Sequence, residues 1–177
     1  MEHIKKVYGK LVKLRALESS DLPLLYAWEN DTELWKEGAT LMPFSREDLK
    51  KYLDSIKDLH CDKQLRLVIE SITNSEVIGL LDLYDYDPIH RRAGVGILID
   101  KAQQRKGYAL DSLAIIANYA NEILGLHQLH CSIRQSNKAS ISLFETAGYS
   151  CSGQIKDWFR SGNELEDQLI FQKILTS

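Results

Sequence analysis

The sequence contains few of the residues that mark disulfide-rich, metal-binding or linker-containing chains. Its 177 residues include only three cysteines, three prolines and ten glycines. Cys61, Cys131 and Cys151 are too few and too scattered for a disulfide framework or a zinc site, and their odd number favours a reducing compartment. The prolines and glycines gather in no linker, so residues 1–177 are expected to form a single domain.

Basic charge and long apolar runs are also scarce. The chain has 22 Lys and Arg against 25 Asp and Glu, a formal charge of −3, without a basic block. Such a chain is a poor binder of nucleic-acid phosphates. The segment Met1–Lys10 lacks the apolar core of a signal peptide, and no run approaches the roughly 20 apolar residues of a membrane helix. These absences predict a cytoplasmic protein that binds neither nucleic acid nor membrane.

The spacing of apolar residues predicts a layered fold of the mixed α/β class. Alternating apolar residues predict strands at 11–17 and 65–69, and further strands are predicted at 77–86, 93–99 and 127–133, followed by a closing hairpin of 149–159 and 164–174. Helices are predicted after caps at Ser20 or Asp21 and at Ser45, over 106–124 and over 138–147. Residues 29–44 show no clear period, which predicts a loop or a broken helix.

A short segment between a predicted strand and the long helix is a candidate anion site. It consists of Gln104, Arg105, Lys106, Gly107, Tyr108 and Ala109. A helix start presents unpaired backbone N–H groups and the positive end of the helix dipole, which suit a phosphate or pyrophosphate. Gly107 allows a ligand to approach the backbone, and Arg105 and Lys106 add positive charge. The alternative is a plain tight turn at Gly107.

Three other segments, together with this one, resemble the GNAT superfamily of acetyl-CoA-dependent N-acetyltransferases. Residues 137–149 are similar to its N-x-x-A-x-x-x-Y-x-x-x-G-F motif, and residues 13–22 to the opening of its ribosomal-protein and polyamine branch. Ile89–Ala93, I-H-R-R-A, is similar to the bacterial spermidine/spermine N-acetyltransferases. The resemblance implies a GNAT fold, with a mixed, mostly antiparallel sheet of six to seven strands flanked by about four helices.

The resemblance also implies how acetyl-CoA is held as the cosubstrate. Backbone amides of Arg105–Ala109 are expected to bind its pyrophosphate, and an N–H of the strand Val95–Leu98 to stabilise the oxyanion. Asn137 is expected to contact the pantetheine arm, although an Asn at a helix start also serves as an N-cap. The implied cofactor residues are Val95, Gly96, Ile97, Leu98, Gln104, Arg105, Lys106, Gly107, Tyr108, Ala109, Asn137 and Phe144.

Two positions depart from the superfamily pattern. Phe144 stands where a tyrosine commonly gives a proton to the leaving thiolate, and Gly94 stands where the polyamine branch has a glutamate. Tyr149 is close in sequence, but its alternative role is a core aromatic. The remaining candidates for proton transfer, by type and position, are Asp82, His90 and Ser142.

The segment Trp28–Glu37 carries four acids and two tryptophans, a composition that can hold a cationic amine by charge and by cation–π contact. The residues predicted to bind the acceptor are Glu33, Trp35, Glu37, Asp82 and Tyr84. The alternative is a solvated acidic face that tryptophans anchor to the core. Asp85 and Asp87, before Pro88, are acidic as well but also typical turn formers.

The leading hypothesis is therefore acetyl transfer from acetyl-CoA to a primary amine, with spermidine or spermine the first choice. A peptide N-terminus, as in the ribosomal-protein type, or an aminoglycoside is the alternative acceptor. A third reading, which Phe144 and Gly94 motivate, is an acetyl-CoA-binding domain without turnover. The branch forms dimers or larger rings, so the resemblance implies a homo-oligomer, and it implies no metal or redox cofactor.

Overall fold

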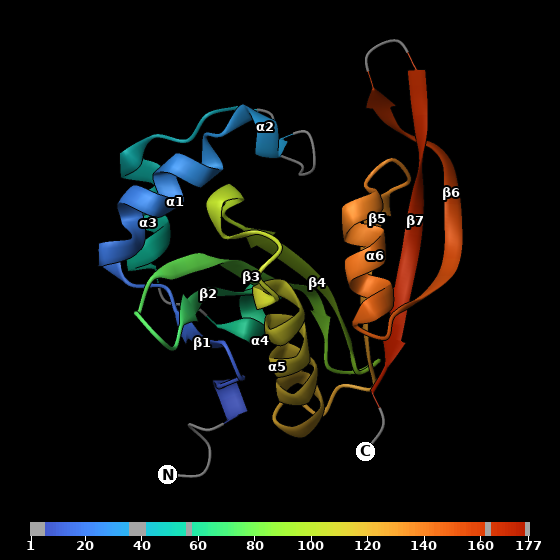
Figure 1. Cartoon of the computed structure of the whole chain (residues 1–177), viewed down its shortest axis with the longest axis horizontal. Helices are drawn as coiled ribbons and strands as arrows, with labels where there is room; N and C mark the ends of the chain where they lie inside the picture. Colours follow the sequence, from blue (N-terminus) through green and yellow to red (C-terminus); the bar gives the residue numbers. More distant parts are fainter. Residues whose placement is uncertain (1–5, 36–41, 56–57, 162–163, 176–177) are drawn as a thin grey trace. The chain divides into compact units, whose positions relative to one another are not determined.

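The chain divides into two compact units. The computed structural model describes residues 6–35, 42–55, 58–161 and 164–175. Met1–Arg15 and Asp58–Ser177 form one unit, here named the sheet unit, and Ala16–Lys57 form the other, the helical unit. Figure 1 colours the chain along its sequence and labels the elements of each unit.

One mixed sheet of seven strands runs in the order β1-β2-β3-β4-β5-β7-β6 (Figure 1). The strands are β1 Val12–Ala16, β2 Leu65–Ser71, β3 Val77–Asp87, β4 Arg92–Ile99, β5 Gln128–Arg134, β6 Ser150–Ser161 and β7 Glu164–Ile174. The pairs β2–β3, β3–β4, β5–β7 and β6–β7 are antiparallel, whereas β4–β5 is parallel. The predicted mixed, mostly antiparallel sheet is therefore confirmed.

The helices follow the sequence prediction with one addition. They are α1 Leu22–Glu29, α2 Thr32–Trp35, α3 Arg46–Asp54, α4 Leu59–Asp62, α5 Tyr108–Glu122 and α6 Lys138–Thr146, with 3₁₀ turns at Ser19–Asp21 and Lys101–Gln103. The four-residue α4 was not predicted, because a single turn is too short to display a helical period. In the described ranges, no helix is long and apolar enough to cross a membrane.

Capping side chains set the helix starts in the helical unit. The Ser45 hydroxyl accepts a hydrogen bond from the N–H of Asp48 at 3.0 Å, as the capping-box pattern predicts. The Arg46 guanidinium then lies 4.5 Å from the centre of the Tyr26 ring. This contact joins α3 to α1, and α2 provides the broken helix that the irregular stretch after residue 29 predicts.

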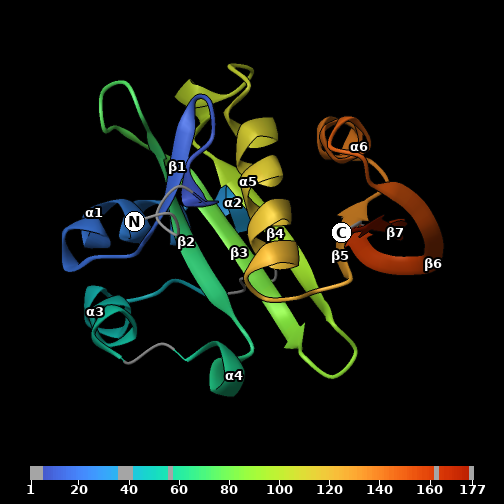
Figure 2. The same ribbon diagram turned by 90° about the horizontal axis from the view of Figure 1, so that it is seen from below.

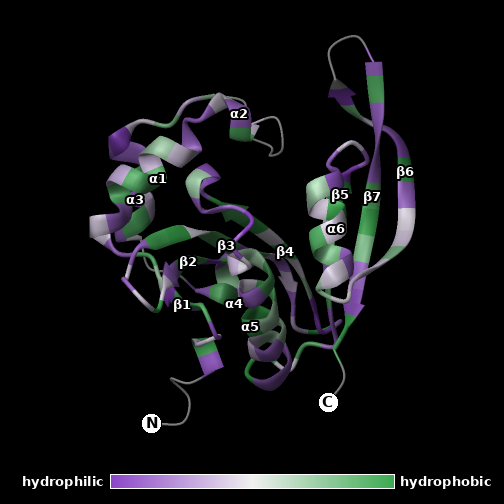
Figure 3. Cartoon of the chain, viewed as in Figure 1, coloured by the Kyte–Doolittle hydropathy of each residue, from purple (hydrophilic) through white to green (hydrophobic). Residues whose placement is uncertain are grey.

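The core of the sheet unit lies between one face of the sheet and α5. Alternate residues of the central strands face it, and residues spaced by three and four on α5 complete it. Its buried members include Leu81, Leu83, Ala93, Val95, Leu129, Cys131, Leu113, Ile116, Ala117 and Ala120. Figure 2 shows α5 lying against β3 and β4. Figure 3 shows that hydrophobic and hydrophilic residues both occur along α5 and along β7. The residues between these strand positions therefore face away from α5.

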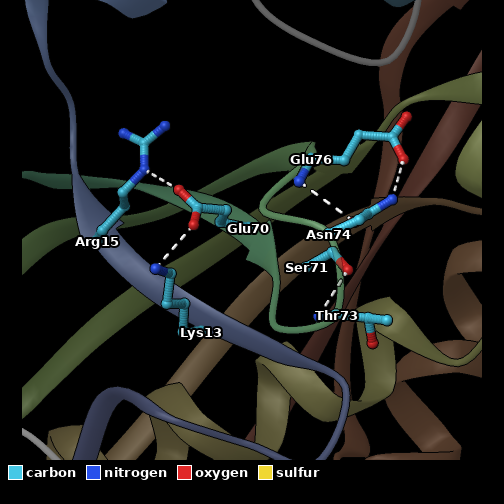
Figure 4. Close-up of polar contacts among 7 residues, drawn as sticks. All are labelled: Lys13, Arg15, Glu70, Ser71, Thr73, Asn74 and Glu76. Atoms are coloured by element: carbon cyan, nitrogen blue, oxygen red, sulfur yellow. Dashed lines mark hydrogen bonds and ion pairs between the residues drawn. The ribbon is translucent and has the colours of Figure 1, made fainter.

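A charged cluster joins β1 to β2 (Figure 4). Glu70 is 8% exposed, and its carboxylate binds the Lys13 ammonium at 2.7 Å and the Arg15 guanidinium at 2.5 Å. Burial raises the pKa of Glu70, but hydrogen bonds and charges from Lys13 and Arg15 outweigh that effect, and the pKa lies below its ordinary value. In the adjoining β2–β3 turn, the N–H of Glu76 donates to the Asn74 side chain at 3.3 Å.

Glu70→Gln is expected to lower the free energy of unfolding by about 1–3 kcal/mol at pH 7. Because folding lowers the pKa of Glu70, its ion pairs stabilise the fold above the unfolded value of about 4.3, and this stabilisation disappears as the pH falls through the folded pKa. Urea denaturation should therefore show the difference shrinking below about pH 4. Exposed Glu76, on the same hairpin, provides the control: Glu76→Gln should change stability by less than about 0.5 kcal/mol. Equal losses in both variants would contradict the prediction.

Candidate active site

The parallel strands β4 and β5 separate partway along their length. In the described structure they pair at Arg92–Gln128, Ala93–Leu129 and Gly94–His130. Beyond these positions β4 continues against β3 to Ile99, and β5 continues against β7 to Arg134. Figures 1 and 2 show the two strands diverging. The two strands are therefore unpaired with each other beyond Gly94 and His130, and this interruption of the β4–β5 pairing is here named the opening.

The edge of β4 along this opening lacks a strand partner in the described structure. Val95 is 1% exposed, whereas Gly96, Ile97 and Leu98 are half-buried, so access increases toward the end of the strand. Backbone N–H and C=O groups on such an edge can pair with an extended chain that carries amides. The four residues predicted to bind the pantetheine arm all lie on this edge.

The predicted anion-binding turn follows at the end of β4. Arg105 and Gly107 both have positive φ, +62° and +86°. In the described structure no side chain caps α5 at Gly107, and the N–H of Asp111 makes the first intrahelical bond, to the Gly107 carbonyl at 3.1 Å. The N–H groups of the first turn, before Asp111, thus take no part in the helical hydrogen bonds, and they lie at the positive end of the helix dipole. Gln104, Arg105, Lys106 and Gly107 are exposed, and Tyr108 and Ala109 are half-buried.

Side-chain hydrogen bonds attach this turn to the sheet. The Gln104 amide donates to the Ile99 carbonyl at 3.2 Å. Gln103 donates to the Glu76 carboxylate at 2.6 Å and accepts from the Lys106 ammonium at 2.8 Å. The turn and the free edge of β4 therefore form one continuous surface, suited to an anion joined to an amide-bearing arm.

The helix α6 carries the remaining predicted cofactor residues. The Asn137 side chain accepts from the N–H of Ser140 at 3.0 Å, which confirms the N-cap; its contact with a pantetheine arm stays a prediction. Phe144 is 4% exposed, and its ring meets Tyr149 edge-on with centroids 5.0 Å apart. Tyr149 is a core aromatic: among the described residues its buried hydroxyl has no hydrogen-bond partner, and burial raises its pKa.

The three candidates for proton transfer are not brought together. Both oxygens of Asp82 accept hydrogen bonds from Arg66, at 2.7 and 2.9 Å, an arrangement of a charge-paired carboxylate rather than a free base. His90 is exposed in the turn between β3 and β4, before the paired part of β4 and away from the opening. Ser142 is exposed on α6, about 200° around the helix from Phe144. The geometry supports none of the three roles.

Tyr84, predicted to contact the acceptor, reaches across β4 toward β5. A Cβ atom on Gly94 would lie 2.2 Å from a carbon of the Tyr84 ring, so the ring covers that glycine. The same ring meets His130 of β5 edge-on at 5.9 Å, and its hydroxyl accepts a hydrogen bond from the N–H of Ser132. Burial, with smaller contributions from Cys131 and Asp85, raises the pKa of Tyr84 to about 12.

This arrangement accounts for the departure at Gly94, which the sequence alone shows only as a missing carboxylate. Tyr84 is the cross-strand partner of Gly94, and Asp82 is that of Gly96. Two glycines at alternate positions of one strand leave space on one face of the sheet, and large residues of the next strand can fill it. That spacing was the signal in the sequence for a ring lying across β4.

An open pocket of about 610 Å³ adjoins His130 on the sheet unit. Its lining residues are Lys63, Asp85, Tyr86, Asp87, Pro88, Ile89, Arg92 and His130. The Asp87 carboxylate accepts from the N–H groups of Ile89 and His90, at 3.1 and 2.9 Å, and pairs with Arg92 at 3.4 Å. Asp87 is thus the turn former of the alternative reading, and Asp85 lies exposed where the β3–β4 register shifts.

The other predicted acceptor residues belong to the helical unit. Glu33 is exposed on α2. Trp35 is half-buried, and its indole N–H donates to the Glu29 carbonyl at 2.6 Å, which supports the alternative role of anchoring the segment. Glu37 lies outside the described residues. Each of these positions stays a prediction for acceptor binding.

Comparison with known proteins adds the following. A family model described as an acetyltransferase (GNAT) domain matches residues 12–150. The chain is 28% identical over 153 residues to the spermidine N(1)-acetyltransferase of Escherichia coli K12, covering 84% of this chain and 77% of that protein. It is 28% identical over 157 residues to that of Vibrio cholerae, covering 87% of each. The crystal structure of a Vibrio cholerae spermidine N-acetyltransferase in complex with CoA and spermine superimposes with a TM-score of 0.83 at 25% identity, over 93% of this chain and 95% of that one.

Proposed function

Because this chain belongs to the GNAT acetyltransferase family, we propose that it transfers the acetyl group of acetyl-CoA to a primary amine of a polyamine, spermidine or spermine. The family confirms the fold and the acetyltransferase class predicted from the motifs, with acetyl-CoA as the cosubstrate. The observation that carries the proposal is the opening between β4 and β5, with the anion-binding turn at its end. We take both compact units as one functional domain, because residues 12–150 include the whole helical unit and part of the sheet unit.

The geometry supports a direct attack of the amine on the thioester. Backbone N–H groups of Arg105–Ala109 bind the pyrophosphate, and the edge of β4 at Val95–Leu98 pairs with the amides of the pantetheine arm. That pairing places the thioester in the opening, where an N–H of β4 stabilises the negative charge that develops on the carbonyl oxygen. An amine nitrogen then forms the new bond to the acetyl carbon as the bond to sulfur breaks.

The polyamine is the favoured acceptor for two reasons. The relatives named above act on spermidine, and one was solved with spermine. In addition, exposed carboxylates at Asp85 of the sheet unit and Glu33 of the helical unit attract ammonium groups. A peptide N-terminus or an aminoglycoside remains the alternative acceptor, and the homo-oligomer stays a prediction.

Thiol release from acetyl-CoA tests the proposal. The purified protein is assayed in parallel with spermidine, spermine, an N-terminal peptide, an aminoglycoside and no acceptor. We expect release to depend on the polyamine, with kcat/KM at least about 10⁴ M⁻¹s⁻¹ as for ordinary enzymes. Release with the peptide or the aminoglycoside alone would move the assignment to that acceptor. Tight binding of acetyl-CoA by folded protein, with no release for any amine, would contradict catalysis and favour the binding-only alternative.

A further inference from the structure

Tyr84 places a hydroxyl group where β4 and β5 separate. The last β4–β5 pair joins Gly94 to His130, and the N–H of Ser132, two residues further along β5, donates to the Tyr84 hydroxyl. Because β7 occupies the other edge of β5, an N–H that reaches Tyr84 points toward β4. Continued pairing would set Ser132 opposite Gly96. The tyrosine oxygen therefore takes a place that the backbone of β4 would otherwise occupy, in the opening between the strands.

The hydroxyl of Tyr84 has a proton to donate at this place. Its oxygen accepts from Ser132, and the O–H group remains a donor. Burial keeps the pKa of Tyr84 near 12, so the group is protonated at neutral pH. The opening is also where the proposed function places the thioester sulfur.

The other hydroxyl groups near the motif do not meet these conditions. Tyr149 directs its ring against Phe144 in the core, and Ser142 is exposed on α6. Phe144, at the superfamily's tyrosine position, has no proton to give. In addition, a side chain at Gly94 would displace the Tyr84 ring, because its Cβ would lie 2.2 Å from that ring. A hydroxyl supplied by Tyr84 instead of by position 144 thus accounts for both departures from the superfamily pattern, the phenylalanine at position 144 and the glycine at position 94.

We propose that Tyr84 is the catalytic acid of this chain and gives its hydroxyl proton to the sulfur of CoA. The inference rests on the proposed acetyl transfer. The amine nitrogen forms a bond to the acetyl carbon, the carbon–sulfur bond breaks with its electron pair passing to sulfur, and the Tyr84 proton moves to that sulfur. The surplus proton of the amine leaves to water, and the tyrosinate recovers a proton from water, so the products are the N-acetyl amine and CoA with a free thiol.

The test replaces the hydroxyl and keeps the ring. Tyr84→Phe is expected to lower kcat about 10²-fold, with the KM for acetyl-CoA and the calorimetric affinity for CoA changed less than about twofold. Tyr149→Phe is the matched control, because it removes a buried hydroxyl that has no hydrogen-bond partner among the described residues, and it should keep wild-type kcat. Thermal denaturation of both variants verifies folding.

A second measurement separates an acid from a structural hydroxyl. Incorporation of a ring-fluorinated tyrosine at position 84 makes the hydroxyl more acidic, and we expect kcat to fall at alkaline pH within a range where the wild-type protein stays active. If the wild-type protein releases thiol and Tyr84→Phe keeps full activity, the role of Tyr84 is overturned. A loss of kcat in Tyr149→Phe alone would overturn it as well. Absence of thiol release by the wild-type protein with every amine would instead contradict the proposed function itself.

Discussion

Alanine in place of Gly79 is expected to lower the free energy of unfolding by at least about 3 kcal/mol, the largest loss of stability we predict for a single methyl group in this chain. A Cβ atom at this position would lie 2.0 Å from the Leu98 carbonyl oxygen and 3.1 Å from the Ile99 Cα. Both are backbone atoms of β4, and Gly79 pairs with Ile69 on its other side. A central strand cannot shift without losing hydrogen bonds to its neighbours, so the clash cannot be relieved without a large loss of stability.

Gly153 of β6 provides the control for this prediction. A Cβ atom there would meet Ile170 side-chain atoms at 3.8 and 3.9 Å, an ordinary van der Waals distance. Gly153→Ala should therefore change the stability by less than about 1 kcal/mol in urea denaturation. If Gly79→Ala and Gly153→Ala unfold at the same urea concentration, β3 and β4 do not approach each other as closely as the structure shows.

Gly94→Ala is expected to lower kcat about 10²-fold and the free energy of unfolding by about 2 kcal/mol. The added methyl group would overlap three carbons of the Tyr84 ring, at 2.2, 2.4 and 2.6 Å. The ring must leave the face of β4, and it takes the hydroxyl away from Ser132. Thiol release and urea denaturation measure the two effects.

Two further variants show whether the ring is the cause. Gly96 lies on the same face, but its Cβ would meet Asp82 and Tyr84 only at 3.9 and 4.0 Å, so Gly96→Ala serves as the stability control. In a Tyr84→Ala background, Gly94→Ala should cost much less stability than it does in the wild type, because the overlapping ring is absent. Equal costs in both backgrounds would contradict a direct contact between the ring and the glycine.

Features that depend on neighbours within a few residues were accessible from the sequence. Alternating apolar residues located the strands, and three- and four-residue spacing located α5. The cap at Ser45 and the cap at Asn137 were both visible, because each side chain bonds an N–H three residues ahead. The glycine at position 107 likewise marked the start of α5 and the turn before it.

Proton-transfer candidates could not be judged in the same way. Asp82 has the chemistry of a base, but its carboxylate binds Arg66, sixteen residues away on β2. His90 belongs to a motif that resembles the polyamine branch, and yet the hairpin carries it into an exposed turn. Residue type states what a side chain can do, whereas its charge partner and position come from strand register, which distant segments decide together.

By itself, the sequence determined the order of the strands and of every helix except α4, the turn before α5 and membership in the acetyltransferase family, since these follow from local periodicity and from contiguous motifs. The tertiary structure decided where β4 and β5 separate and what fills the space over Gly94. Pairing between β4 and β5 ends after three residue pairs, and Tyr84 enters from β3 because β4 carries no side chain at that point. The glycine spacing in β4 indicates space for a large side chain, but the residue that fills it and the end of the β4–β5 pairing depend on the register of β3 and on β5, whose paired residues lie more than thirty positions further along the chain.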